Sequence, residues 1–187
     1  MRNLVVFNHV SLDGYFVGDH GDSSFAHTGN EDPEYAAWQK NNAGMKAEMV
    51  FGRVTYELME SYWPTARAKK ESPEFAEAMN NSPKVVFSKK MDRADWSNTR
   101  LLKGNLASEV KKLKSESGPD LIIFGSGTII SQLAQDGLID AYTIVVNPVV
   151  LGKGRTMFEG LSEIKKFKLG KTKTFKNGKV VLNFEAE

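Results

Sequence analysis

Residues 121–128 read Leu-Ile-Ile-Phe-Gly-Ser-Gly-Thr, and this stretch decides the fold. The four apolar residues are typical of a buried strand, the next four form a tight turn, and a helix is expected over 129–135. A strand, a turn and a helix in this order leave backbone N–H groups free at the helix N-terminus, where a negative charge is favoured. The stretch therefore predicts one unit of an α/β domain with an anion site at its turn.

Similar units lie on both sides of this stretch. Strands are expected at 4–10, 47–51, 85–87 and 141–151, and helices over 34–42, 54–61, 73–80 and from 106 to the Gly118-Pro119 break. Loops are expected over the polar segment 14–32 and the rest of 64–83. The tail alternates apolar and polar residues on either side of Asn177-Gly178, which predicts a hairpin. This order of elements predicts an α/β domain with a mixed sheet and a C-terminal β-hairpin.

Length and composition limit the class of protein. The 187 residues suit one domain, 1–187, and 41% hydrophobic with 26% charged residues is ordinary for a globular chain. The net charge of +2 is too small to predict a nucleic-acid or membrane-surface partner. The chain has no cysteine and no apolar run long enough for a signal peptide or a membrane span, so we expect a cytoplasmic protein.

Two further strand ends carry residues that bind anions. They are Gly52, Arg53 and Thr55 after one expected strand, and Ser88 and Lys89 after another. Cationic side chains, hydroxyls and the N–H groups of a helix start all donate to phosphate oxygens. Each segment alone also fits a plainer role, such as a helix start, a solvated loop or an ordinary tight turn. In an open α/β sheet, however, ligands bind outside the carboxyl ends of the strands, so all three are expected to converge on one polyphosphate ligand.

Other kinds of site find less support. A Rossmann fingerprint needs a third glycine where Ile130 stands, and the P-loop and serine-hydrolase motifs are absent from the sequence. The three histidines lack metal-ligand spacing, so no metal site is expected. The carboxylates nearest the expected pocket mouth, and hence the substrate-binding candidates, are Asp13, Asp32 and Glu34. Since helix caps and turn acids look the same in a sequence, no catalytic residue is assigned.

Six short motifs occur in one order along the chain. They are Ser11-Leu12-Asp13-Gly14, Gly52-Arg53-x-Thr55-Tyr56-Glu57, Phe87-Ser88-Lys89, Gly125-Ser126-Gly127-Thr128, Gly137-Leu138-Ile139-Asp140 and Pro148-x-x-Leu151-Gly152-x-Gly154, followed by Phe158. From about residue 3 to the end, the chain resembles the C-terminal reductase domain family of riboflavin biosynthesis, a branch of the dihydrofolate reductase fold. It is similar to stand-alone bacterial members, because nothing matches the zinc deaminase domain of the bifunctional enzymes. The resemblance implies a three-layer domain whose mixed, mostly parallel central sheet is flanked by helices.

The resemblance also implies NADPH as hydride donor. The resemblance implies that Gly52, Arg53 and Thr55 bind phosphate groups of the cofactor and that Ser88 and Lys89 bind its 2′-phosphate. The implied ligands of the pyrophosphate are Gly125, Ser126, Gly127 and Thr128. The implied neighbours of the nicotinamide are Val17 and Gly18. The family's substrate, 5-amino-6-(5-phosphoribosylamino)uracil, carries a ribose phosphate that Lys153 and Arg155 would bind. Dihydrofolate reductases hold the pterin with a carboxylate on the first helix, and Tyr35 falls at that place here, so folate reduction is not expected.

Three functions stay open at this point. The leading one is an NADPH-dependent reductase of a small heterocyclic substrate. The second is a nucleotide-binding module that keeps the cofactor cleft without reductase turnover, and the third is a phosphosugar-binding enzyme unrelated to nicotinamide. A homodimer is expected as well, because the apolar run 141–151 is longer than a single strand needs and would extend across two chains, although Pro148 interrupts it.

Overall fold

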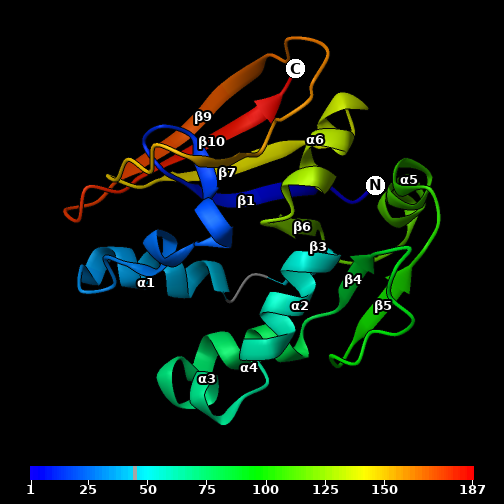
Figure 1. Cartoon of the computed structure of the whole chain (residues 1–187), viewed down its shortest axis with the longest axis horizontal. Helices are drawn as coiled ribbons and strands as arrows, with labels where there is room; N and C mark the ends of the chain where they lie inside the picture. The colour runs from blue at the N-terminus through cyan, green and yellow to red at the C-terminus, as the bar shows by residue number, and fades with distance from the viewer. Residues whose placement is uncertain (44–45) are drawn as a thin grey trace.

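The computed structural model describes residues 1–43 and 46–187. A twisted eight-stranded sheet in the order β5-β4-β3-β6-β1-β7-β10-β9 forms its centre (Figure 1). The strands are β1 Leu4–Val10, β3 Glu48–Gly52, β4 Lys84–Phe87, β5 Thr99–Leu102, β6 Leu121–Phe124, β7 Ala141–Val146, β9 Phe167–Thr174 and β10 Val180–Ala186. Neighbouring strands from β5 to β7 are parallel, and β10 is antiparallel to both β7 and β9. The predicted mixed sheet with a C-terminal hairpin is confirmed.

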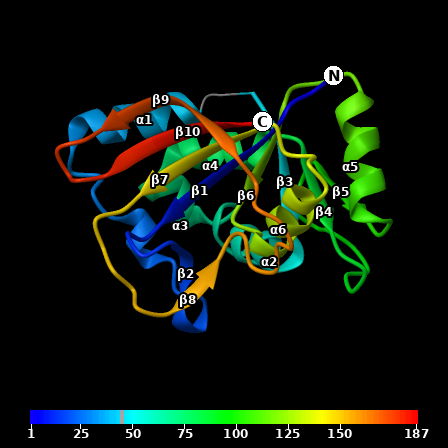
Figure 2. The same ribbon diagram turned by 90° about the horizontal axis from the view of Figure 1, so that it is seen from above.

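Helices cover both faces of this sheet (Figures 1 and 2). They are α1 Pro33–Ala43, α2 Arg53–Tyr62, α3 Ala66–Glu71, α4 Pro73–Asn81, α5 Leu106–Ser115 and α6 Gly127–Gln135. α1 to α4 lie on one face and α5 and α6 on the other, which makes three layers. A small antiparallel ribbon, β2 Tyr15–Gly18 with β8 Gly154–Thr156, lies beyond the carboxyl end of β1 (Figure 2).

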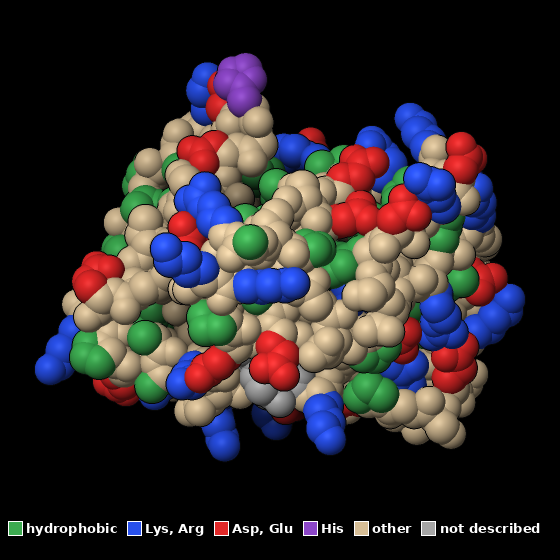
Figure 3. Space-filling model, turned by 90° about the horizontal axis from the view of Figure 1, so that it is seen from below, with side chains coloured by type: hydrophobic (Ala, Val, Ile, Leu, Met, Phe, Trp, Pro, Cys, Tyr) green, Lys and Arg blue, Asp and Glu red, His purple; other side chains and the backbone are tan. Residues whose placement is uncertain are grey.

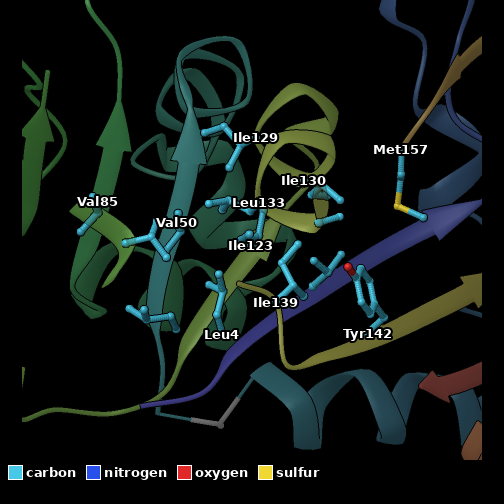
Figure 4. Packing of buried hydrophobic residues seen from close by; sticks show 14 of the residues in the cluster. Leu4, Val50, Val85, Ile123, Ile129, Ile130, Leu133, Ile139, Tyr142 and Met157 are labelled. Carbon is cyan, nitrogen blue, oxygen red and sulfur yellow. The ribbon is translucent and has the colours of Figure 1, made fainter. Parts of the chain in front are cut away.

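Apolar side chains hold the layers together because the strands alternate between the two faces. Leu4, Val50 and Ile123 point towards α6, where Ile130 and Leu133 meet them (Figure 4). On the opposite face one cluster lies against α2 and α4 and includes Phe51, Tyr56 and Trp96. A smaller cluster lies against α1 and includes Tyr35, Val145 and Phe175. Between these two clusters, the sheet surface at β1 and β6 lies between α1 and α2.

The strand expected over 141–151 is wrong in its length. β7 ends at Val146, because Pro148 has no N–H for the ladder and the carbonyl of Val149 instead accepts from the amide of Leu12 at 2.7 Å. β7 is also bonded to β1 on one side and to β10 on the other. It therefore has no free edge to extend across two chains, and the homodimer stays a prediction without that argument.

Several short elements lie where the sequence predicts loops. The segment 14–32 contains β2 and two 3₁₀ turns, η1 Asp19–Gly21 and η2 Ser24–His27, while α3 lies within 64–83. β5 and β8 were not expected either. η1, α3 and β8 are mostly polar and exposed, whereas β2, β5 and η2 are only four residues long, so none of them shows the apolar periodicity on which prediction depends. Among the described residues, no helix combines the length and apolar character that a membrane crossing requires.

Candidate functional site

The turn between β6 and α6 joins two of the predicted anion-binding segments. Ser126 stands at the helix start in a left-handed conformation with φ of 54°, which turns both its hydroxyl and its amide towards the end of β3. The amide of Gly52 donates to Ser126 Oγ at 2.9 Å, and the amide of Ser126 donates to Thr55 Oγ1 at 3.1 Å. The expected convergence of these two strand ends is therefore present in the fold.

Asn8 on β1 and the absence of a side chain at Gly125 hold the turn in place. The amide of Gly125 donates to Asn8 Oδ1 at 2.7 Å, and Asn8 Nδ2 donates back to the carbonyl of Gly125 at 3.2 Å. Gly125 has φ of +56°, and a Cβ there would lie 3.1 Å from the Thr55 side chain. The sequence analysis did not identify Asn8, which is buried and 117 positions from its partner.

The first turn of α6 keeps two N–H groups without an acceptor. The amides of Ile129 and Ile130 both donate to the carbonyl of Ser126, at 2.9 and 3.1 Å. For the amides of Gly127 and Thr128, the described part of the chain provides no acceptor. Gly127 is buried, so its unpaired N–H carries a cost that a phosphate oxygen would remove. The donor set and the positive end of the helix dipole fit an anion.

The β2–β8 ribbon lies directly against this turn. The ring of Phe16 covers Gly127 so closely that a Cβ there would lie 2.7 Å from it. Arg155 on β8 donates from Nη2 to Thr128 Oγ1 at 3.3 Å. β2 also carries Val17 and Gly18, so the predicted nicotinamide neighbours and the predicted pyrophosphate ligands belong to one site. Lys153, by contrast, forms an ion pair with Asp19.

An open groove of about 820 Å³ lies between α2 and the segment after β4. Its lining residues are Arg53, Glu57, Glu60, Lys90, Met91, Asp92 and Arg93. Arg53 pairs with Glu57 at 2.7 Å, and Ser88 Oγ accepts from the amides of Lys90 and Met91 at 3.1 Å. Ser88 thus shapes the turn, while Lys90 and Arg93 line the groove. The sequence analysis emphasised Lys89, which is exposed on the same turn.

Among the substrate-binding candidates, Asp13 connects two loops. Its Oδ1 accepts from the amide of Leu151 at 3.1 Å, and its Oδ2 accepts from the amide of Gly152 at 2.7 Å. The Ser11 hydroxyl, together with these amides, lowers the pKa of Asp13 to about 2. Asp13 is therefore ionised at neutral pH, with its oxygens already bound.

The other two candidates lie at the start of α1. Asp32 is buried, and its Oδ1 accepts from the amides of Glu34 and Tyr35 at 3.0 and 3.3 Å. Its Oδ2 accepts from the amide of Asn177 in the hairpin turn at 3.0 Å. Burial opposes ionisation of Asp32, but these N–H groups outweigh it and lower its pKa. Glu34 is exposed and pairs with Lys173 of β9 at 3.0 Å. The structure thus ties the three acids to three different segments.

A row of aromatic rings forms the sheet surface between α1 and α2. Phe7 lies between Phe124, at a centroid distance of 5.7 Å, and Trp38 of α1, at 6.1 Å and nearly parallel. All three rings are half-buried. Figure 3 views the molecule from this side, where apolar side chains are interspersed with charged ones. Partly exposed rings on a strand end suit a flat ligand that stacks on them.

A polar cluster borders this aromatic row, and sequence reasoning missed all of it. Lys179 is buried and donates to Asn147 Oδ1 at 2.6 Å, while Asn147 Nδ2 faces His9 Nδ1 at 3.4 Å. Lys179 also lies over the ring of Tyr35, 4.9 Å from its centroid. Burial lowers the pKa of Lys179 to about 8. No sequence signal marks this cluster, because its hydrogen-bonded partners lie 32 and 138 positions apart.

The sheet order and the arrangement of helices on its two faces define an α/β domain with the dihydrofolate reductase fold. A dihydrofolate reductase from Enterococcus faecalis, complexed with NADP(H), superimposes with a TM-score of 0.64 at 13% identity over 99% of this chain and 96% of that one. A family model of the RibD C-terminal domain matches residues 2–181. The chain belongs to that family, as its motifs predicted.

Two further solved structures share the fold. A protein from Shewanella sp. PV-4, whose description proposes a part in riboflavin biosynthesis, has a TM-score of 0.75 at 22% identity, covering 100% of this chain and 99% of that one. A diaminohydroxyphosphoribosylaminopyrimidine deaminase/5-amino-6-(5-phosphoribosylamino)uracil reductase from Thermotoga maritima has a TM-score of 0.67 at 17% identity. It covers all of this chain and 57% of that one. The predicted fold class is confirmed.

Proposed function

We propose that this protein is an NADPH-dependent reductase of a small heterocyclic substrate, and that 5-amino-6-(5-phosphoribosylamino)uracil is the first compound to test. The observation that carries the proposal is the start of α6, where two unpaired N–H groups stand beside Thr55 and Arg155. The RibD C-terminal domain family and the reductase named in the Thermotoga structure support the reaction class. The proposed substrate is a small molecule, and we propose neither a nucleic-acid nor a membrane partner.

The cofactor half of the cleft comprises Gly52–Thr55, Ser88–Arg93 and Gly125–Thr128. Its donors suit a dinucleotide carrying an extra phosphate: the α6 amides would hold the pyrophosphate, and the cations of the turn after β4, Lys89 and Lys90, would hold the 2′-phosphate. When bound, NADPH supplies a hydride to a carbon atom of the substrate. Phe16 covers Gly127, so β2 would have to shift for a phosphate to reach that amide.

The proposed substrate half of the site consists of the half-buried rings of Phe7, His9 and Trp38, together with Asn147 and Lys179, which are buried. Its aromatic rings would hold a flat ring against the sheet and exclude water from the reacting faces. Hydride transfer needs chiefly two rings held face to face, which is a matter of positioning. The carboxylates of Asp13 and Asp32 are already bound by backbone amides, so the proposal assigns them no role in proton transfer.

Two measurements test this proposal. NADPH at about 100 times its Kd should stabilise the fold by roughly 2.7 kcal/mol and raise the Tm by several degrees. Loss of reduced-nicotinamide absorbance should follow addition of 5-amino-6-(5-phosphoribosylamino)uracil and should not follow addition of dihydrofolate. An unchanged Tm would defeat the cofactor assignment. A raised Tm without turnover on pyrimidine or pterin substrates would favour the nucleotide-binding module instead.

A further inference from the structure

His9 is a titratable side chain to which the proposed reaction gives no task. Residues of β1 alternate between the faces of the sheet, so His9 lies on the same face as Phe7. The two rings meet edge to face with centroids 5.7 Å apart. His9 is half-buried and stands one residue before the end of β1. It thus ends the aromatic row at the carboxyl edge of the sheet, where α/β domains bind ligands.

Asn147 determines which His9 nitrogen carries the hydrogen. The Lys179 ammonium can only donate, so the Asn147 atom 2.6 Å from it is the amide oxygen. Asn147 Nδ2 donates to the carbonyls of Val10 and Val145, at 2.9 and 3.1 Å, and faces His9 Nδ1 at 3.4 Å. An amide nitrogen cannot accept a hydrogen bond. His9 Nδ1 is therefore the unprotonated nitrogen, and Nε2 carries the hydrogen.

The surroundings of His9 keep the imidazole neutral. Burial lowers its pKa to about 3, the charge of Lys179 acts in the same direction, and so, more weakly, does His27 of η2. The contact with Asn147 opposes them. Tyr35, the titratable residue of α1 in this cluster, is also neutral, because burial raises its pKa to about 12. His9 is thus a neutral hydrogen-bond donor at physiological pH.

The His9 Nε2 atom is reached by solvent. The described residues offer it no hydrogen-bond partner, yet within that part of the chain no buried side-chain nitrogen or oxygen lacks one. Nε2 is consequently reached by solvent, beside the ring of Phe7. A single N–H next to an aromatic surface matches a flat heterocycle with an acceptor in its plane. The Lys179 charge behind it disfavours a cationic ring.

We propose that the Nε2–H of His9 is the donor with which this protein selects its substrate, a flat heterocycle that presents a carbonyl oxygen or an unprotonated ring nitrogen at the carboxyl end of β1. The inference rests on the proposed function, which makes this cleft the substrate half. Asn147 and Lys179 are positioning residues: Lys179 orients the Asn147 amide, and Asn147 orients the imidazole and sets its tautomer.

Two variants distinguish the hydrogen bond that His9 donates to the substrate from the packing of its ring. His9→Phe keeps a flat ring and removes the donor, whereas His9→Gln keeps a donor at similar reach. With saturating NADPH and 5-amino-6-(5-phosphoribosylamino)uracil, His9→Phe should lower kcat/KM roughly 5- to 150-fold, the equivalent of leaving one acceptor unpaired. His9→Gln should recover most of this loss, and both variants should keep the wild-type Tm and Kd for NADPH. Wild-type kcat/KM in His9→Phe, or no recovery in His9→Gln, overturns the assignment.

Nitrogen NMR of the imidazole tests the inference without turnover. Wild-type protein at neutral pH should show a protonated Nε2 and an unprotonated Nδ1, and the same uracil compound added to NADPH-saturated protein should shift Nε2. A compound that shifts Nε2 without oxidising NADPH contradicts the proposed function and supports this inference. Equal turnover by wild type and His9→Phe supports the proposed function and contradicts this inference. A protonated Nδ1, or an Nε2 signal that does not move, overturns the inference.

Discussion

The cofactor half of the cleft presents backbone N–H groups and exposed cations, whereas the substrate half presents aromatic rings and a buried lysine. In the cofactor half, Gly125–Thr128 and Gly52–Thr55 are each a single short segment at a strand end. In the substrate half, His9, Asn147 and Lys179 come from three distant parts of the chain and meet only in the fold. The cofactor half thus presents contiguous segments of the chain, whereas the substrate half presents side chains from distant parts of it.

This difference determines how each half responds to substitution. The Gly125–Thr128 turn presents N–H groups of its own backbone, so a change beside those groups should affect the ligand more than the fold. Asn147 and Lys179 are buried and hold several segments at once, so a change at either residue should affect stability first. Ligand affinity and stability should therefore respond differently to substitutions in the two halves.

The largest effect is expected from Gly127→Val in the cofactor half. A Cβ at this position meets the Phe16 ring at 2.7 Å, so the branched side chain would displace β2 and cover the unpaired amides of α6. Losing charge-assisted hydrogen bonds costs roughly 10- to 150-fold in affinity for each bond lost, so the Kd for NADPH should rise at least about tenfold.

Gly137→Ala is the matched control for this variant. Gly137 ends the same helix with φ of +64°, and no atom lies within 4 Å of a Cβ built there. Alanine in that conformation costs about 1–2 kcal/mol of stability but lies at the far end of α6. It should lower the Tm and leave the Kd for NADPH unchanged in titrations by intrinsic fluorescence. If Gly127→Val loses stability alone and keeps full affinity, the turn has no ligand role.

A smaller effect is expected from substituting the lysines on the turn after β4. The two cofactors differ by one 2′-phosphate, so Lys89→Ala and Lys90→Ala should weaken NADPH binding and leave NADH binding nearly unchanged. A hydrogen bond to a charged group is worth about 1.5–3 kcal/mol, or roughly 10- to 150-fold in Kd, and solvent screening favours the lower end. Paired titrations with the two cofactors measure the preference. Equal weakening of both cofactors would show that the 2′-phosphate is bound elsewhere.

At the start of α1, the helix that carries Trp38 of the substrate half, Asp32→Ala should affect stability rather than cofactor affinity. The side chain caps α1 and also accepts from the amide of Asn177, so its removal leaves three N–H groups without their acceptor. We expect the Tm to fall by roughly 4–8 °C, with the Kd for NADPH unchanged. Glu34→Ala is the matched control, since its exposed pair with Lys173 should contribute little. A large loss of NADPH affinity in Asp32→Ala would contradict the division between the two halves.

The smallest effect concerns pH. Burial lowers the pKa of Lys179 to about 8 from its usual 10.5, so between these values the unfolded chain binds more protons than the folded one. Stability should therefore rise from pH 8 towards pH 10, by roughly 2–4 °C in Tm. Lys179→Met should reduce this rise. Lys84, which is buried against Trp96 with its pKa also lowered to about 8 by burial, supplies an independent share. An unchanged pH dependence in Lys179→Met would show that the ammonium is not desolvated.

The strand, turn and helix start of the cofactor half were predictable from the sequence because their signals are local. Leu121–Phe124 followed by two glycines specifies a strand, a turn and a helix start, and each of these was predicted near its observed place. Asp32 accepts from the amides of Glu34 and Tyr35 and so caps α1, the helix that the sequence predicts over 34–42. Family motifs then placed these units in one known order. The groove residues Lys90 and Arg93 adjoin a turn that the sequence had already singled out.

The substrate half was not predictable for a physical reason. Lys179 follows an Asn-Gly turn and looks like an exposed hairpin lysine, yet it is buried because η2 and α1 cover it. His9 lies in an apolar strand with no metal or catalytic spacing around it. Burial sets the pKa of both residues and the Asn147 amide connects them, but no local pattern reports a partner 138 or 32 positions away.

The place of β1 in the sheet has a consequence for how the chain reaches its folded state. β1 is the first strand along the sequence and lies between β6 and β7, whose residues follow more than 100 positions later, as the 117 positions between Asn8 and Gly125 show. During synthesis an apolar strand with two unpaired edges must therefore wait for most of the chain to emerge. Pairing between such distant segments is slow, and exposed apolar strands are where aggregation begins. The yield of folded protein should thus depend more on protection of β1 during that interval than on the stability of the finished domain.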